Sequence, residues 1–294
     1  MNCFIIDRRV NLKNDFRLGN CRIVCGIFLW VILLFSCCVT AAEPEGKCHS
    51  VAEIKARGKL LVGIYNDDPY FSYIKPHTYE LVGFDVDIAH ALAQEIMGDP
   101  NKIEFVIVDS EDRIATLLEG KVDLIIAELS ITNKRREMVD FSDVYYVAGQ
   151  SVLVNSDSPY GVLKDLEGKN VGALSGTTNA IHAANALPGA KFVYFSNLSS
   201  GFQALRQGQI QAFCIDDVLL LALRSDSNGV LKGYRFIGGE ISWESYGIAV
   251  TKGCTEFLNA VNQAIAKIKK DGRWQQIYDR NIGSVSAVSA RPPV

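Results

Sequence analysis

The chemistry of this chain is clearest in the ten residues from Ala127 to Arg136, where Ser130, Thr132 and Arg135 stand close together. An arginine offers a planar pair of N–H donors that matches a carboxylate, and small hydroxyl residues beside it supply further donors. The segment therefore indicates a receptor for a carboxylate group. A simpler interpretation stays open, in which Ser130 or Thr132 caps a helix and Arg135 and Arg136 lie in solvent.

A second segment with the features of an anion site is Ser175-Gly176-Thr177-Thr178. It follows a predicted strand, Asn170 to Ala173, and opens a predicted helix. Glycine lets the backbone turn tightly, and the free N–H groups of a first helical turn attract negative charge. An ordinary capped helix start would explain Thr177 and Thr178 equally well.

The first 41 residues have the pattern of an export signal. Five basic residues precede an apolar run from Ile23 to Val39, and Val39-Thr40-Ala41 offers small residues for cleavage after Ala41. A membrane anchor of barely spanning length is an alternative. A lipoprotein is another, because Leu34-Phe35-Ser36-Cys37 resembles a lipobox. We expect a periplasmic protein with a signal peptide over residues 1–41, or one held to the membrane by a lipid or an uncleaved signal.

Composition narrows the function further. The 294 residues carry a net charge of −3, and residues 1–41 hold five basic and two acidic residues, so the remainder is more acidic, at −6. An acidic body argues against nucleic acid as a partner. The four histidines show no ligand spacing, so we predict no metal and no cofactor. Outside the leader only Cys48, Cys214 and Cys254 remain; Cys214 and Cys254 could pair, or all could be inert thiols.

From Lys59 onward, short apolar runs alternate with amphipathic stretches, which predicts α/β units with mostly parallel sheets. The second such block begins near Ser151. Because ligands of α/β sheets collect at the carboxyl ends of strands, it matters that the carboxylate-receptor segment follows a predicted strand. The predicted strands are Leu60–Ile64, Ile103–Val108, Val122–Ala127, Val152–Val154, Asn170–Ala173, Gln209–Ile215 and Tyr246–Val250, and the predicted helices are Asp87–Ile96, Arg113–Leu118 and Gly272–Tyr278.

In the order and spacing of its motifs, the chain from about Lys59 to Gly283 resembles the periplasmic polar-amino-acid-binding proteins that feed ABC importers. The resemblance implies a periplasmic-binding-protein type II fold, in which two α/β sandwich lobes are joined by two crossover strands. Lobe one would comprise 48–147 and 246–285, lobe two 148–245, and a C-terminal tail 286–294. The crossovers would lie near Tyr145–Gly149 and Ser242–Tyr246. The motifs are Gly83–Ala89, Gly120–Ala127, Ser130–Thr132 with Arg135, Val139–Ser142, Gly176–Thr178, Asp216, Tyr246–Val250 and Asp271-Gly272.

The same resemblance implies roles for individual residues. Arg135 would grip an α-carboxylate, with Ser130 and the Thr178 N–H as further donors. Asp216 would take the α-ammonium group, because a zwitterion stripped of water needs a partner for each charge. Arg113 stands where relatives that take glutamate or aspartate have an arginine for the side-chain carboxylate, which favours an acidic ligand. Asp67, Asp68, Tyr70 and Phe71 lie in the loop after the first strand, where relatives supply an aromatic wall and sometimes an acid for the ligand. Tyr70 or Phe71 would stack on the ligand or simply pack in the core. The other candidate ligand-binding residues are Thr132 and Thr177.

Glu128 departs from the family pattern, because relatives usually have a small residue there. A second carboxylate in the cleft would repel an acidic side chain unless Arg113 or Arg136 neutralised it. Glu128 could instead help to bind the ammonium group, bind a cationic side chain such as that of arginine, or point to solvent.

We expect a monomeric, non-enzymatic protein that delivers an amino acid, glutamate or aspartate in the first instance, to the membrane subunits of an ABC importer. Two other functions stay open. A few proteins of this fold are cyclohexadienyl or arogenate dehydratases, and for such an enzyme Glu128 would be the candidate acid. The fold also serves as the ectodomain of signalling receptors.

Overall fold

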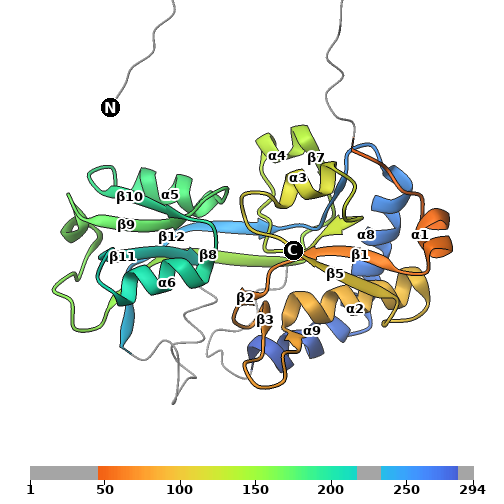
Figure 1. Ribbon diagram of the computed structural model, residues 1–294, viewed down its shortest axis with the longest axis horizontal. Helices are drawn as coiled ribbons and strands as arrows, with labels where there is room; N and C mark the ends of the chain where they lie inside the picture. The colour runs from red at the N-terminus through yellow and green to blue at the C-terminus, as the bar shows by residue number, and fades with distance from the viewer. Residues whose placement is uncertain (1–45, 217–232, 284–294) are drawn as a thin grey trace, which may run out of the picture. The chain divides into compact units, whose positions relative to one another are not determined.

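The computed structural model describes residues 46–216 and 233–283 (Figure 1). The predicted signal peptide and its cleavage site, Asp217 and the tail 286–294 lie outside the described residues. Within them, no helix is both long enough and apolar enough to span a membrane. Two five-stranded sheets organise the chain, and each is the centre of one lobe.

The sheet of lobe one has the strand order β5-β1-β6-β13-β7. Strand β1 runs parallel to β5 and β6, whereas β13 pairs antiparallel with β6 and β7. Because β13 comes from the last third of the sequence, the chain leaves this lobe and returns to it. The strands are β1 (Leu60–Ile64), β5 (Ile103–Ile107), β6 (Leu124–Ile125), β7 (Val139–Phe141) and β13 (Ala249–Thr251).

Alternate residues of these strands bury opposite faces, as the two-residue period of a strand requires. Leu60, Val62 and Ile64 pack in one core with α2, α8 and α9, and Leu61 faces the other core with Leu117 of α3. The helices are α1 (Val51–Arg57), α2 (Phe84–Met97), α3 (Arg113–Leu118), α4 (Asn133–Met138), α8 (Thr255–Lys270), α9 (Arg273–Tyr278) and a π-helix (Asp279–Gly283), and a small sheet is formed by β2 (Asp67–Asp68), β3 (Ser72–Ile74) and β4 (Leu81–Val82).

Lobe two is built in the same way, with the strand order β10-β9-β11-β8-β12. Phe213 and Ile215 of β11 pack with α6, whereas Ala212 and Cys214 face α5, and Figure 1 shows these helices on opposite sides of the sheet. The elements are β8 (Tyr146–Asn155), a 3₁₀ helix (Leu163–Leu166), β9 (Asn170–Leu174), α5 (Thr178–Ala186), β10 (Lys191–Phe195), α6 (Leu198–Arg206), β11 (Ala212–Asp216) and β12 (Tyr234–Tyr246).

Two long strands, β8 and β12, connect the lobes and pair antiparallel from Tyr146↔Tyr246 to Gly149↔Trp243. The expected fold class, two α/β lobes joined by two crossover strands, is confirmed, and the residue limits of the lobes stay a prediction. The expectation of mostly parallel sheets is wrong, since β8, β12 and β13 all pair antiparallel. Strands that carry the chain between lobes enter each sheet against its direction, and the apolar pattern of a sequence does not encode direction.

The pairing of Cys214 with Cys254 is also corrected. Cys254 forms a disulfide with Cys48, whereas Cys214 is a buried thiol within β11. Cys214 packs against the α5 side of lobe two, and burial raises its pKa to about 12. The disulfide instead ties the segment before α1 to the start of α8, and it closes a loop with a sequence separation of 206 residues.

We expect the double substitution Cys48→Ser and Cys254→Ser to lower the free energy of unfolding by about 2–5 kcal/mol, because the cross-link restricts the unfolded chain. Urea unfolding with and without a thiol reductant measures the effect. The reductant should destabilise the wild type to the level of the double variant and leave the variant unchanged. A wild type indifferent to the reductant would contradict the prediction.

Candidate ligand-binding site

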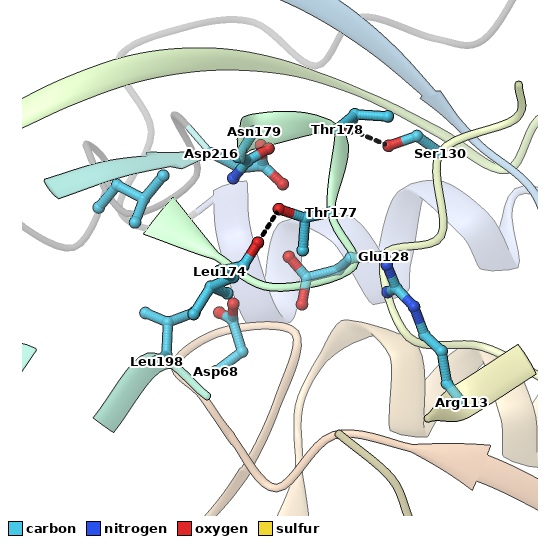
Figure 2. A pocket seen from close by; sticks show the side chains of 11 residues that line it. Asp68, Arg113, Glu128, Ser130, Leu174, Thr177, Thr178, Asn179, Leu198 and Asp216 are labelled. Atoms are coloured by element: carbon cyan, nitrogen blue, oxygen red, sulfur yellow. Dashed lines mark hydrogen bonds between the residues drawn. The ribbon is translucent and has the colours of Figure 1, made fainter. Parts of the chain in front are cut away.

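A pocket lies at the carboxyl ends of β6, β9 and β11, the position at which α/β sheets bind ligands (Figure 2). Four of its lining side chains are acids or an arginine that the sequence places far apart. The lining residues are Asp68, Arg113, Glu128, Ser130, Leu174, Thr177, Thr178, Asn179, Leu198, Ile215 and Asp216.

Arg135 lies beside this pocket, on the short helix α4. Thr132 is the N-cap of that helix, and its hydroxyl accepts a hydrogen bond from the Arg135 N–H at 3.1 Å. The guanidinium donates to the Ser130 carbonyl at 2.8 Å and to the Gly176 carbonyl at 2.7 Å. Burial, and then the charge of Arg113, lower the pKa of Arg135 to about 10. The simpler interpretation is thus right for Thr132 and wrong for Arg135, which is 8% exposed.

The segment from Gly176 to Thr178 meets this arginine from lobe two. Thr177 caps α5, accepting from the Ala180 N–H, and donates to the Leu174 carbonyl at 2.7 Å. The Thr178 hydroxyl is 3.0 Å from that of Ser130 and accepts a hydrogen bond from the buried amide of Gln150. The predicted carboxylate receptor and the predicted anion-binding helix start are therefore brought together.

Asp216 ends β11 and lines the same pocket. Its carboxylate accepts a hydrogen bond from the hydroxyl of Tyr246, a fully buried residue at the end of β12. Tyr70 is half-buried, has a left-handed backbone (φ 77°), and packs against the cores of both lobes. Neither Tyr70 nor Phe71 lines the described pocket; Phe71 is wholly within the core of lobe one.

Arg113 is 2% exposed and lines the pocket, so a solvated position is excluded. Its guanidinium donates hydrogen bonds to the Tyr65 hydroxyl and to the Ala127 carbonyl, and it stacks over the Tyr65 ring at 5.4 Å. The positive charge is therefore held at the pocket wall by neutral acceptors.

Glu128 is buried and points into the pocket (Figure 2), which excludes the solvent-facing alternative. Its backbone is left-handed, with φ 50°, a conformation that costs a non-glycine residue about 1 kcal/mol or more. Its carboxyl group lies within hydrogen-bonding reach of that of Asp68, which is also buried. Burial, followed by the charges of Asp68 and Asp85, raises the pKa of Glu128 well above its usual range.

A third acid, Asp85, lies behind this pair in the first turn of α2. It is fully buried, and the Tyr145 hydroxyl and the Glu128 N–H lie near its carboxyl group without hydrogen bonds of normal geometry. Burial raises the pKa of Asp85 to about 8. The N-cap of α2 is Gly83, and Asp85 lies inside the core.

Several contributors were missed by sequence reasoning. Asp68 was named only as one of two acids in a loop where relatives sometimes have an acid for the ligand, Tyr246 only as a strand residue, and Gln150 and Asn179 not at all. An acid in the segment that follows the first strand was a usable signal for Asp68. No local pattern identifies Gln150, because its amide reaches Thr178 and Asn179 through strand pairing distant in sequence.

The geometry can be compared with known proteins. Residues 60–284 match the profile of the bacterial extracellular solute-binding proteins, family 3. The chain belongs to this family. Among similar proteins, the glutamine-binding protein of a Bacillus subtilis ABC transporter is 36% identical over 260 residues, which cover 86% of this chain and 94% of that protein. A glutamine-binding protein of Geobacillus stearothermophilus is 40% identical over 223 residues, covering 75% and 83%.

This solute-binding protein also resembles solved structures. An ancestral arginine-binding protein, solved with glutamine and with arginine, is 38% identical with a TM-score of 0.70, covering 77% of this chain and 99% of the ancestral one. The family and these relatives are binding proteins rather than enzymes, in agreement with the expectation for this chain.

The substitution Asp85→Asn tests the buried acid. An Asp85 pKa of about 8 means that the folded protein holds a proton that the unfolded chain, with a pKa near 3.8, releases. This contribution to stability is fully present below about pH 4 and is lost as the pH rises through 8. Between pH 5 and 7, Asp85 should make the free energy of unfolding of the wild type fall by about 1.4 kcal/mol per pH unit. The variant should lack this part of the pH dependence. Urea titrations at several pH values measure it; equal slopes would contradict the assignment.

Proposed function

We propose that this protein captures one polar α-amino acid outside the cytoplasmic membrane and delivers it to an ABC importer. The observation that carries the proposal is that Ser130 from lobe one, with Arg135 bonded to its carbonyl beside the pocket, and Asp216 from lobe two meet at one pocket. Arg135 with Ser130 would hold the α-carboxylate, and Asp216 the α-ammonium group. The family membership and the amino-acid-binding relatives support this function.

The physical reason for two receptors is desolvation. A zwitterion that leaves water for a closed site must regain its hydration energy from paired charges and hydrogen bonds, or binding is unfavourable. The hydrogen bonds that Arg135 donates to the Ser130 and Gly176 carbonyls use two of its five N–H groups, so donors remain for a carboxylate. The Thr178 N–H, at the first turn of α5, would add a donor favoured by the helix dipole.

Closure of the lobes would complete the site. The contacts that cross between the lobes in the described structure include Arg135 to the Gly176 carbonyl, Ser130 to Thr178, Ser110 to the Ser196 carbonyl at 3.1 Å, and the Ser199 N–H to Asp67 at 2.9 Å. A ligand that touches both lobes favours this arrangement over an open one by its differential affinity. Closure thus couples ligand capture to a shape that an importer could recognise.

The charged residues of the pocket point in two directions for the side chain of the ligand. Arg113 was the reason to favour glutamate or aspartate, and its place at the pocket wall is compatible with that role. The carboxyl groups of Asp68 and Glu128 weigh against it, because an acidic side chain would enter a site already rich in negative charge. The named relatives bind glutamine, and the ancestral structure holds glutamine or arginine.

Replacing Arg135 tests the carboxylate receptor. We expect Arg135→Ala to weaken binding of the preferred amino acid by about 100-fold or more, because a buried charge loses its partner. A thermal-shift panel of the twenty amino acids identifies the ligand, and calorimetry then gives the affinity. The matched control is Arg136→Ala, the exposed neighbour that stacks on Phe141, which should bind normally. A panel without any stabilising amino acid, or full affinity in Arg135→Ala, would contradict the proposal.

The substitution Gly176→Ala tests closure. A Cβ at Gly176 would lie 2.7 Å from the Ser110 carbonyl oxygen and 2.8 Å from the Glu111 Cα, both backbone atoms of the other lobe. We expect affinity to fall about 10-fold or more, with a larger radius of gyration in small-angle scattering when the ligand is saturating. Gly168→Ala is the control, since Gly168 has the same φ of 71° and no atom within 4 Å of its Cβ position. Similar losses in both variants would show a backbone effect instead.

A further inference from the structure

The pocket contains more carboxyl groups than are needed to pair with the single ammonium group of a zwitterion. If Asp216 pairs with the α-ammonium group, the carboxyl groups of Asp68 and Glu128 are left over, at 4% and 8% exposure. Among the described residues, no donor forms a hydrogen bond with Asp68 Oδ1 or Glu128 Oε1. Buried oxygens without donors are costly, and a protein retains them where something else supplies the donor.

The groups that face the pair are mostly further acids and tyrosines. The other acids facing it are Asp67 on β2, Asp85 on α2 and Asp216 on β11, and Tyr65, Tyr145 and Tyr246 face Glu128. Arg113 is a cation in the same pocket; its hydrogen bonds go to the Tyr65 hydroxyl and the Ala127 carbonyl, and its Nε–H has no hydrogen-bond partner among the described residues. Two carboxyl groups in contact under these conditions share a proton rather than both ionise.

We infer that Asp68 and Glu128 form a proton-sharing carboxyl pair that recognises a cationic side chain, guanidinium or ammonium, of the bound amino acid and gives up its proton when that side chain binds. This inference rests on the proposed function and names the ligand class within it. A cationic group offers donors alone and therefore matches a receptor made of acceptors. A carboxamide offers an acceptor in addition to its donors, and a carboxylate offers acceptors alone.

The charge balance gives the inference a measurable signature. Before binding, the pair carries one proton and one negative charge. When a cationic side chain enters, the shared proton passes to the buffer, the pair becomes doubly negative, and the local charge is unchanged by binding. One proton is released for each ligand bound, so affinity should rise about tenfold per pH unit while the pair still holds its proton.

The experiment is calorimetry of the full protein with arginine, lysine, glutamine and glutamate, in two buffers of different ionisation enthalpy and across pH 6–8. We expect arginine or lysine to bind at least tenfold more tightly than glutamine or glutamate, with release of one proton. In Glu128→Gln, which keeps the shape and cannot ionise, affinity for the cationic ligand should fall about 10- to 100-fold and proton release should vanish. Asp68→Asn should behave alike, and Glu137→Gln, an exposed acid after Arg136, should match the wild type.

The outcomes separate the two proposals. If no amino acid binds, the proposed function itself fails. If an amino acid binds through Arg135 but glutamine or glutamate is preferred, or if Glu128→Gln and Asp68→Asn leave ligand rank and proton count unchanged, the inference about the pair is overturned and the proposed function stands. A thermal unfolding temperature equal to or above that of the wild type confirms that each variant is folded.

Discussion

The removal of charged groups from water is the constraint on which the rest of this structure depends. Arg113, Arg135, Asp68, Asp85 and Glu128 are all nearly or fully buried around one pocket. In such a setting an ion needs a partner of opposite charge, several hydrogen bonds, or a change of protonation. The arginines take carbonyl and hydroxyl oxygens as partners, whereas the acids respond with raised pKa values.

The architecture supplies these partners by bringing strand ends together. Glu128 and Ser130 follow β6, Leu174 ends β9 and Asp216 ends β11, so two sheets from separate lobes present their carboxyl ends to one space. The crossover strands help to hold this geometry. The Tyr246 hydroxyl, at the end of β12, donates a hydrogen bond to Asp216, and the Tyr246 backbone forms a β-bridge with Ser130. One residue thus connects the carboxylate of Asp216 in lobe two with the backbone of Ser130 in lobe one.

Sequence reasoning succeeded where the signal was local. The short apolar run Leu60–Ile64 predicted β1 with its observed limits, and Arg113–Leu118 was predicted as the helix observed. It failed where contacts between segments distant in sequence determine the structure. Strand β12 was predicted only at its end, since Tyr234–Tyr246 contains Gly238 and Gly239 at a register shift, and no pattern in the sequence tells which cysteine lies near Cys254. The site residues were identified by type and motif, but whether Glu128 faced solvent or the pocket required the fold.

Glu128 shows why that last question matters most. Its backbone is left-handed, which disfavours a side chain with a Cβ, and its carboxyl group is buried against another acid. Both costs would be absent with glycine at this position, so the folded protein without ligand gains nothing evident from a glutamate there. A residue that is unfavourable twice over in the folded protein is best explained by a contact made outside the protein's own atoms. The donor that Glu128 lacks is one that a bound amino acid would bring, so the cost of burying this carboxyl group becomes part of the selectivity for the ligand.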